Sequence, residues 1–343
     1  MSRGAIRVAF LVVLFLVPSL SAQSYDLVLL DVGGAELVSV AAINDSGEIV
    51  GMVRPEGVES TTPVIWRGSE RSILGGPAAR GYARGINSRG EVALELHVGT
   101  DNHALVWYGS AGRRIEAPDR YPVAMGLNDA GAVTGFCASE NPDRWGAFRW
   151  LDGRLTMLPR LRGIHESIGY AINASGDVAG SVGSADEISF AVIWKENEII
   201  ELPALPGASY SLAVDINDSG VAVGSSGLAY LPRAVRWENS QILDLGTAGE
   251  ELSAAHGINE QGVVVGAAVL PGEAEAHAML WRGRAAFDLN ALIRDPQGCV
   301  VLSGAAINNR GQIAALGRCG DDDRVLPMRL DPRTEPRRRA VGR

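Results

Sequence analysis

The pattern Ile/Leu-Asn-x-x-Gly occurs seven times along this chain. A glycine follows each asparagine of the pattern after three residues, and the asparagines are Asn44, Asn87, Asn128, Asn173, Asn217, Asn259 and Asn308. Successive asparagines are 43, 41, 45, 44, 42 and 49 residues apart. A repeat period in the low forties is typical of a four-stranded propeller blade. The pattern therefore predicts an all-β fold, a seven-bladed β-propeller.

Each unit contains four short β-prone runs separated by turn residues, which indicates four antiparallel strands per blade. In the unit of Asn259 these runs are 254–258, 263–266, 278–281 and 286–289. Asparagine in the first and glycine in the fourth position suit a type I turn, because glycine tolerates the left-handed conformation that returns the chain. The period leaves open a six- or eight-bladed ring and a β-solenoid as alternatives.

A tryptophan follows each of the first six asparagines by 20 to 22 residues. In the seventh unit Leu330 takes this place, and the tryptophans are Trp66, Trp107, Trp150, Trp194, Trp237 and Trp281. Aromatic side chains bury a large apolar area. We interpret these residues as packing contacts between neighbouring sheets.

The two ends of the chain predict how the ring closes. The seventh unit has only three predicted strands, because Pro332 and an arginine-rich segment follow the third one. Residues 25–31 have the pattern of a fourth strand. We therefore expect the N-terminal strand to complete the last blade, which removes an exposed sheet edge. The predicted propeller spans residues 25–332, and residues 333–343 are predicted to form a disordered tail.

Residues 1–22 have the features of a secretory signal peptide. Arg3 and Arg7 precede an almost wholly apolar run at 8–16, and Ser21 and Ala22 offer a small-residue cleavage site. The run is too short to span a bilayer, and no second long apolar stretch follows it. We expect a mature chain that is secreted or periplasmic and has no membrane span.

The charge balance limits the class of partner. The net charge of −9 becomes −11 without the signal peptide, and the five arginines and one glutamate of the tail leave the propeller body near −15. Phosphate backbones require a basic surface, so this balance argues against a nucleic-acid partner. We expect a monomer that binds an extracellular protein, peptide or glycan.

Two of the three cysteines flank the last asparagine turn. Cys299 and Cys319 are nearly symmetric about it, so antiparallel pairing would bring them opposite each other. An oxidising compartment would then allow a disulfide between them. Cys137 is expected to pack as a small apolar residue.

Several segments before the repeat tryptophans share a further pattern. They are His-Ala-Leu-Val-Trp at 103–107, Gly-Ala-Phe-Arg-Trp at 146–150, Phe-Ala-Val-Ile-Trp at 190–194 and His-Ala-Met-Leu-Trp at 277–281. Together with Asp-Leu-Gly-Thr at 244–247, they resemble the bacterial extracellular HAF-repeat family over residues 26–332, although no unit keeps a literal His-Ala-Phe. The resemblance implies export and a propeller-like fold, and it supplies no catalytic residues.

No motif of this sequence concentrates catalytic or metal-binding chemistry. The five histidines lack a His-x-x-x-His spacing, and neither a Gly-x-Ser-x-Gly elbow nor an Asp-x-Asp-x-Asp-Gly loop occurs. We predict no catalytic residue, no metal site and no cofactor, and hence a non-enzymatic binding or scaffold protein. The alternatives are an enzyme acting on an extracellular polymer, such as a glycan lyase or hydrolase, and a purely structural envelope protein.

The ligand site is predicted on the face that carries the long loops, close to the central axis. The long connections, between second and third strands and between blades, all emerge on this face, and loops on a rigid scaffold commonly bind ligands. The first strand of each blade should run innermost. At the position two residues before the asparagine, every unit has Ala or Gly except one, which has Asp215. Close packing of the blades requires such small residues.

Three residues before each asparagine the units diverge. The residues there are Ala41, Arg84, Met125, Tyr170, Val214, His256 and Ala305. We predict that Arg84, Tyr170 and His256, with the loop aromatics Tyr82 and Trp145, line a pit where a small anionic or polar ligand docks. The alternatives are neutral drift among the repeats and aromatic residues that merely anchor loops.

Overall fold

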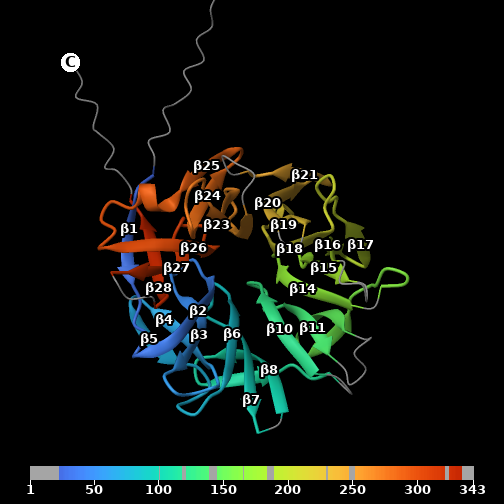
Figure 1. Cartoon of the computed structure of the whole chain (residues 1–343). Coiled ribbons are helices and arrows are strands. Elements are labelled where there is room, and N and C mark those ends of the chain that lie inside the picture. Colours follow the sequence, from blue (N-terminus) through green and yellow to red (C-terminus); the bar gives the residue numbers. More distant parts are fainter. Residues whose placement is uncertain are drawn as a thin grey trace, which may run out of the picture.

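The seven repeats fold into seven four-stranded antiparallel sheets, which stand as blades around a central axis (Figure 1). This computed structural model describes residues 23–99, 101–117, 121–138, 145–164, 166–183, 189–228, 231–246, 252–320 and 324–333. The predicted signal peptide, 1–22, and residues 334–343 of the predicted tail lie outside this part of the chain. The prediction of an all-β, seven-bladed propeller is confirmed, and the six-bladed, eight-bladed and solenoid alternatives are wrong.

The strand order is the same in every blade. The innermost strands contact one another around the axis, and they are β2 (Ala35–Ile43), β6 (Gly81–Ile86), β10 (Tyr121–Leu127), β14 (Glu166–Ile172), β18 (Tyr210–Ile216), β22 (Ser253–Ile258) and β26 (Cys299–Ile307). The second strands are β3 (Ile49–Pro55), β7 (Val92–Val98), β11 (Val133–Ala138), β15 (Val178–Gly183), β19 (Ala222–Leu228), β23 (Val263–Val269) and β27 (Ile313–Cys319). The third strands are β4 (Thr62–Arg67), β8 (Asp101–Tyr108), β12 (Gly146–Leu151), β16 (Ser189–Lys195), β20 (Leu231–Glu238), β24 (Ala276–Arg282) and β28 (Leu326–Pro332).

The outermost strands are short, except for the one that comes from the N-terminus. They are β5 (Glu70–Ile73), β9 (Ala111–Arg114), β13 (Arg154–Met157), β17 (Glu198–Glu201), β21 (Gln241–Asp244), β25 (Ala285–Asp288) and β1 (Tyr25–Leu29). A 3₁₀ helix, η2 (Leu289–Leu292), follows β25. We number the blades from 1, which starts with β2, to 7, which consists of β26, β27, β28 and β1.

The N-terminal strand closes the ring, as predicted. β1 pairs antiparallel with β28 from Tyr25 opposite Pro332 to Leu29 opposite Met328. Tyr25 and Leu27 are buried in the core of blade 7. Without β1, the edge of β28 would expose unpaired backbone groups.

The seven asparagine turns form a closed ring of hydrogen bonds. Each Asn Nδ2 donates to the carbonyl oxygen of the asparagine of the next blade, from Asn44 to Asn87 (3.1 Å) and onward, until Asn308 donates back to Asn44 (2.8 Å). Each Asn Oδ1 accepts the backbone N–H of the residue four positions later. The glycine of each turn has a positive φ, between 72° and 82°, which explains why glycine occupies it. The repeated asparagine therefore joins neighbouring blades as well as shaping its turn.

We call the end of the ring with these turns the turn face, and the opposite end the loop face. Each inner strand runs from the loop face to the turn face, so its early residues lie near the loops. The repeat tryptophans lie in the third strands near the turn face, and five of the six are buried. The indole N–H of four of them donates to a carbonyl of the preceding blade: Trp66 to Asp31, Trp194 to Pro159, Trp237 to Pro203 and Trp281 to Gly246. These tryptophans pack between blades, whereas Trp107 is half-buried and bonds to Gly109.

The cysteines lie in two of the blades. In blade 7, Cys299 and Cys319 are opposite each other in the β26–β27 register and are joined by a disulfide. In blade 3, Cys137 is buried in β11, in a core cluster with Phe148 and Trp150. The structure thus places the two flanking cysteines together and the third in an apolar core.

Candidate functional site

Four polar and aromatic side chains gather at the loop face of blade 2. Tyr82 and Arg84 come from β6, and Glu95 and His97 come from the neighbouring strand β7. The antiparallel register places Tyr82 directly opposite Glu95. Because β6 is an innermost strand, this group, which we call the blade 2 cluster, lies near the central axis.

A buried carboxylate holds the blade 2 cluster together. The Glu95 side chain is only 7% exposed, and its two oxygens lie 3.2 Å from Arg84 Nη2 and 3.1 Å from His97 Nε2. The Arg84 guanidinium stands 4.7 Å from the centre of the Tyr82 ring, and His97 meets the same ring edge-on at 5.6 Å. A carboxylate taken out of water requires such partners. The cation–π contact fixes Arg84 further.

This arrangement changes what Arg84 can recognise. The sequence suggested an arginine available to an anionic ligand, but Glu95 neutralises its charge. About a third of the Arg84 side chain remains exposed, at 31%. The exposed parts of Arg84 and His97 offer polar groups beside the Tyr82 ring, so the cluster suits a polar ligand better than a strongly anionic one.

His256 acts between blades 6 and 7. Its Nδ1 lies 3.1 Å from the carbonyl oxygen of Gly304 and 3.2 Å from Ser303 Oγ, both on β26. Burial lowers the pKa of His256 below its ordinary value. The imidazole is therefore neutral near pH 7, and one of its ring nitrogens is already used between the blades.

The other two predicted ligand residues lie apart from these. Tyr170 is half-buried on β14 of blade 4, and the Trp145 ring, which precedes β12 of blade 3, stacks on Phe136 at 5.2 Å. Within the described part of the chain, no hydrogen bond, ion pair or ring contact joins Arg84 to Trp145, Tyr170 or His256. The structure brings Tyr82 and Arg84 together and places the remaining three in other blades.

Asp215 interrupts the row of small residues next to the axis. Its carboxylate accepts two backbone N–H bonds, from Ile216 at 2.9 Å and from Ile258 of the next blade at 2.8 Å. Burial nevertheless raises its pKa to about 7. In other blades the same position packs against backbone; a Cβ on Gly257 would lie 3.1 Å from Ala306 Cα. Asp215 thus replaces a steric contact between blades with a hydrogen bond.

The axial opening on the turn face is small and polar. It is a pocket of about 160 Å³, lined by five of the turn asparagines and by residues directly before and after the turn asparagines. Three carboxylates line this opening, but each accepts a backbone N–H from the preceding blade, and they are Asp45, Asp129 and Glu260. These side chains are part of the contacts between blades.

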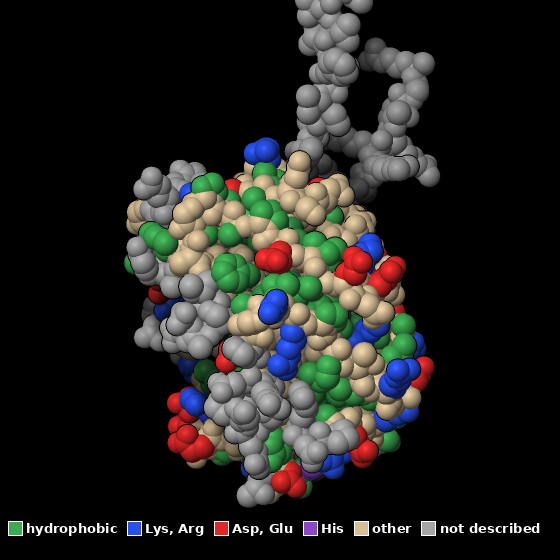
Figure 2. Space-filling model, turned by 90° about the vertical axis from the view of Figure 1, so that its right-hand side faces the viewer, with side chains coloured by type: hydrophobic (Ala, Val, Ile, Leu, Met, Phe, Trp, Pro, Cys, Tyr) green, Lys and Arg blue, Asp and Glu red, His purple; other side chains and the backbone are tan. Residues whose placement is uncertain are grey.

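Charged side chains elsewhere are interspersed. The flank seen in Figure 2 has acidic and basic groups scattered among apolar ones. Across the described residues, no group of three or more His, Cys, Asp or Glu side chains is placed to hold a metal ion. Within the same residues, no helix is long and apolar enough to cross a membrane.

The sequence reasoning missed Glu95 and His97 as partners of Arg84. The sequence motifs test the histidines only for the spacing of metal ligands, and they do not single out Glu95. The signal that could have found Glu95 is the strand register, because residues equidistant from an antiparallel turn lie opposite each other.

Comparisons with known proteins support the fold. No protein-family model matches the chain, and no curated protein matches it. Among solved structures, a puromycin-hydrolyzing peptidase of Mycobacterium tuberculosis is similar over 87% of this chain, with a TM-score of 0.59 and 13% identity. This chain spans 52% of the length of that peptidase.

Two further structures are covered almost completely. A catalytically inactive variant of virginiamycin B lyase from Staphylococcus aureus, with quinupristin, matches over 90% of this chain and 99% of its own, with a TM-score of 0.54 and 11% identity. The β-propeller domain of the Trilobed protease from Pyrococcus furiosus matches over 87% and 94%, with a TM-score of 0.56 and 9% identity. At these identities the likeness establishes a propeller scaffold.

Proposed function

We propose that this chain is an exported, non-enzymatic binding or scaffold protein whose ligand docks on the loop face near the central axis. The observation that carries the proposal is the blade 2 cluster. It fixes Arg84 between a buried carboxylate and an aromatic ring, and leaves 31% of the Arg84 side chain exposed. Groups preorganised in this way lose little conformational freedom on binding.

The rigid ring supports a binding role. Seven inter-blade hydrogen bonds and the strand β1 lock the blades, so loop-face residues are held at fixed positions. The partner we propose is an extracellular protein, peptide or glycan, because aromatic rings beside polar groups suit sugars and peptide side chains alike. The resemblance to HAF-repeat proteins, and the signal-like segment 1–22, support export to the periplasm or beyond.

One observation favours an enzyme as the second candidate. The Glu95 and His97 side chains are 3.1 Å apart, a distance at which a proton can pass between a carboxylate and an imidazole. An enzyme acting on an extracellular polymer could use such a pair. A purely structural envelope protein would use neither group for a ligand.

The test is a binding screen of the mature protein against glycan arrays and extracellular peptides, followed by calorimetry on the hits. Arg84→Ala should weaken binding about tenfold or more, since hydrogen bonds to charged groups are worth about 1.5–3 kcal/mol. Arg54→Ala is the matched control, because Arg54 also pairs with a glutamate on the loop face, 3.7 Å from Glu36 in blade 1. Equal binding by the parent and Arg84→Ala would refute the site. Product formation by substoichiometric protein would favour the enzyme.

A further inference from the structure

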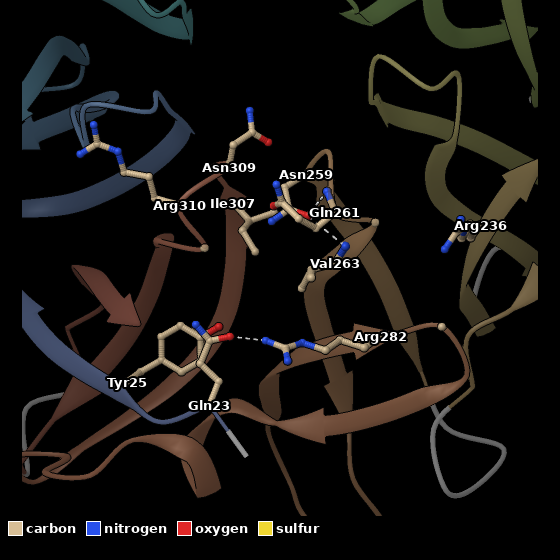
Figure 3. Close-up of a pocket in the computed structure, with 13 residues that line it drawn as sticks. Gln23, Tyr25, Arg236, Asn259, Gln261, Val263, Arg282, Ile307, Asn309 and Arg310 are labelled. Carbon is tan, nitrogen blue, oxygen red and sulfur yellow. Dashed lines mark hydrogen bonds between the residues drawn. The ribbon is translucent and has the colours of Figure 1, made fainter. Parts of the chain in front are cut away.

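A cavity of about 460 Å³ opens on the turn face between blades 6 and 7 (Figure 3). The asparagine turns of both blades, the β24–β25 turn and the segment that leads into β1 form its walls. This volume lies within the range of small-molecule sites. Three arginines line the cavity, Arg236, Arg282 and Arg310, and none of the described residues that line it is a carboxylate.

Arg282 is the central charge of this cavity. Figure 3 shows its side chain extending toward Gln23 and Tyr25, with Arg236 and Arg310 on opposite sides of the view. One guanidinium nitrogen donates to Gln23 Oε1, and the guanidinium also interacts electrostatically with the Tyr25 hydroxyl. Tyr25 is 1% exposed, and burial raises the pKa of its hydroxyl, which therefore stays neutral. Arg282 thus bonds only to neutral groups, and its buried Nε has no partner in the described part of the chain.

The repeat provides an internal comparison for this charge. Arg67, Arg89 and Arg329 occupy the repeat positions of Arg282, Arg310 and Arg236, respectively, in blades 1, 2 and 7. Each of these three arginines is paired with a carboxylate: Arg67 with Glu48 at 2.6 Å, Arg89 with Glu91 at 2.5 Å, and Arg329 with Asp331 at 2.8 Å. The arginines at the same three repeat positions in blades 1, 2 and 7 are therefore neutralised by carboxylates.

Blades 6 and 7 lack two of the neutralising acids. Glu48 and Glu91 stand four residues after their asparagines, where blade 6 has Val263 and blade 7 has Gln312. Arg236 keeps an acidic partner, Glu238, at 2.8 Å. Within the described residues, no ion pair joins Arg282 or Arg310 to a carboxylate. In a chain with a net charge of −9, this cavity, which forms a groove between blades 6 and 7, retains the uncompensated positive charges of Arg282 and Arg310.

We propose that the groove between blades 6 and 7 binds a small ligand through an oxyanion group, a carboxylate, sulfate or phosphate. A guanidinium presents several donors in a fixed fork that matches the oxygens of such groups. Arg282 anchors the oxyanion, Arg310 closes over it from the rim, and the Gln261 side chain contacts neighbouring polar atoms of the ligand. This site lies on the face opposite the blade 2 cluster and does not depend on the function proposed for that cluster.

Calorimetric titration of the mature protein at fixed ionic strength tests the site, with chloride as the background anion. The probes are inorganic phosphate, sulfate and a uronic-acid trisaccharide. We expect at least one of them to bind with one-to-one stoichiometry and to bind more weakly as salt is raised. Tighter binding of the trisaccharide would identify an acidic sugar as the source of the oxyanion, and tighter binding of the inorganic ions would identify a free anion.

Three variants test whether the positive charge of Arg282 binds the ligand. Arg282→Ala should weaken binding at least about tenfold. Val263→Glu should do the same, because it introduces the carboxylate that Glu48 provides beside Arg67, and its melting temperature shows whether the fold is kept. Arg67→Ala is the matched control and should bind like the parent. Absence of binding by all three probes at millimolar concentration, or parental affinity in both Arg282→Ala and Val263→Glu, would overturn the proposal.

Discussion

Replacement of one ring asparagine should cost far more than replacement of an ordinary turn residue. Asn128 is a suitable choice because both of its side-chain bonds are short and buried: Nδ2 to the Asn173 carbonyl at 2.8 Å and Oδ1 from the Ala132 N–H at 2.9 Å. Asn128→Ala removes both bonds and leaves the buried Ala132 N–H without an acceptor. Two lost bonds at about 1 kcal/mol each, with about 1–2 kcal/mol for the unsatisfied donor, give a destabilisation of about 3–4 kcal/mol.

A second substitution separates the ring from the turn. Asn128→Asp keeps the acceptor for the Ala132 N–H but turns a carboxylate oxygen toward the Asn173 carbonyl oxygen. At neutral pH it should therefore destabilise the protein although aspartate is a good turn residue. Burial against a carbonyl would raise the folded-state pKa of the new side chain above the ordinary value of about 3.9. Stability should then recover as pH falls through that raised pKa, since the protonated form can donate to Asn173.

Equilibrium denaturation followed by tryptophan fluorescence measures both effects. The control is Asn102→Ala, because Asn102 is exposed on β8 and such surface changes usually lie within about 0.5 kcal/mol. If Asn128→Asp unfolds like the parent at pH 7, the inter-blade bond contributes nothing and the asparagine serves only its own turn. A loss below about 1 kcal/mol for Asn128→Ala would refute the estimate as a whole.

Four further predictions concern closure, the disulfide and the pH dependence of Asp215 and His256. Deletion of residues 25–31 should expose the edge of β28 and cause aggregation, visible by light scattering; a monomer with unchanged melting would contradict the closing role of β1. Cys319→Ala should cost about 3 kcal/mol, from the 20-residue separation of the cysteines, and free thiols in the exported protein by mass spectrometry would exclude the bond. In the folded protein the pKa of Asp215, about 7, exceeds its ordinary value of 3.8. Protonated Asp215 therefore adds to the unfolding free energy at low pH, and this contribution is lost as pH rises through 7. Asp215→Ala should remove that slope in unfolding free energy, and an unchanged slope would refute the assignment. For His256, whose pKa is lowered, stability should instead fall as pH drops below 6.5, and His256→Gln should abolish this fall.

The fold could be predicted from the sequence because its signals repeat. A single Asn-x-x-Gly turn is weak, but seven at nearly constant spacing fix the number of blades, and the leftover N-terminal strand fixes the closure. In five units a second glycine follows the asparagine by seven residues, and the nearby backbone of the inner strand explains why a glycine is needed there. A Cβ on Gly135, for example, would meet the Val123 carbonyl oxygen of the bulged inner strand at 1.9 Å.

The candidate site was less predictable, because it depends on contacts across strands and blades. Divergence at one repeat position selected Arg84 as a candidate, but could not reveal that Glu95 neutralises it. The same rule grouped His256 and Tyr170 with Arg84, and the three residues lie on the innermost strands of three different blades. Trp145 was chosen as a loop aromatic, and it stacks on Phe136 of its own blade.

The asparagine ring was also outside the reach of local reasoning. Asn44 and Asn308 are 264 residues apart, and only closure of the ring shows that one donates to the other. A turn residue needs an acceptor, which any small polar side chain can supply. The donor half of the amide bonds to the next blade in every unit, and in the units of Asn44, Asn87 and Asn308 it also bonds to the side chain four residues later. This double use is a physical reason for asparagine in all seven units, where aspartate or serine would satisfy the turn alone.

Comparison among the blades separates structural residues from those available to a ligand. Where all seven units agree, as at the asparagine and its glycine, the residue serves packing or turn geometry. Where one residue type recurs but its partner changes, its functional group becomes available to a ligand. An arginine follows the repeat tryptophan in blades 1 and 6, but of these two only Arg67 pairs with a glutamate. An uncompensated, half-buried charge destabilises the fold unless another interaction offsets the cost of taking it out of water. This chain keeps Arg282 but has Val263 where Glu48 stands beside Arg67, and this is why the groove between blades 6 and 7 is the place to look for an anion.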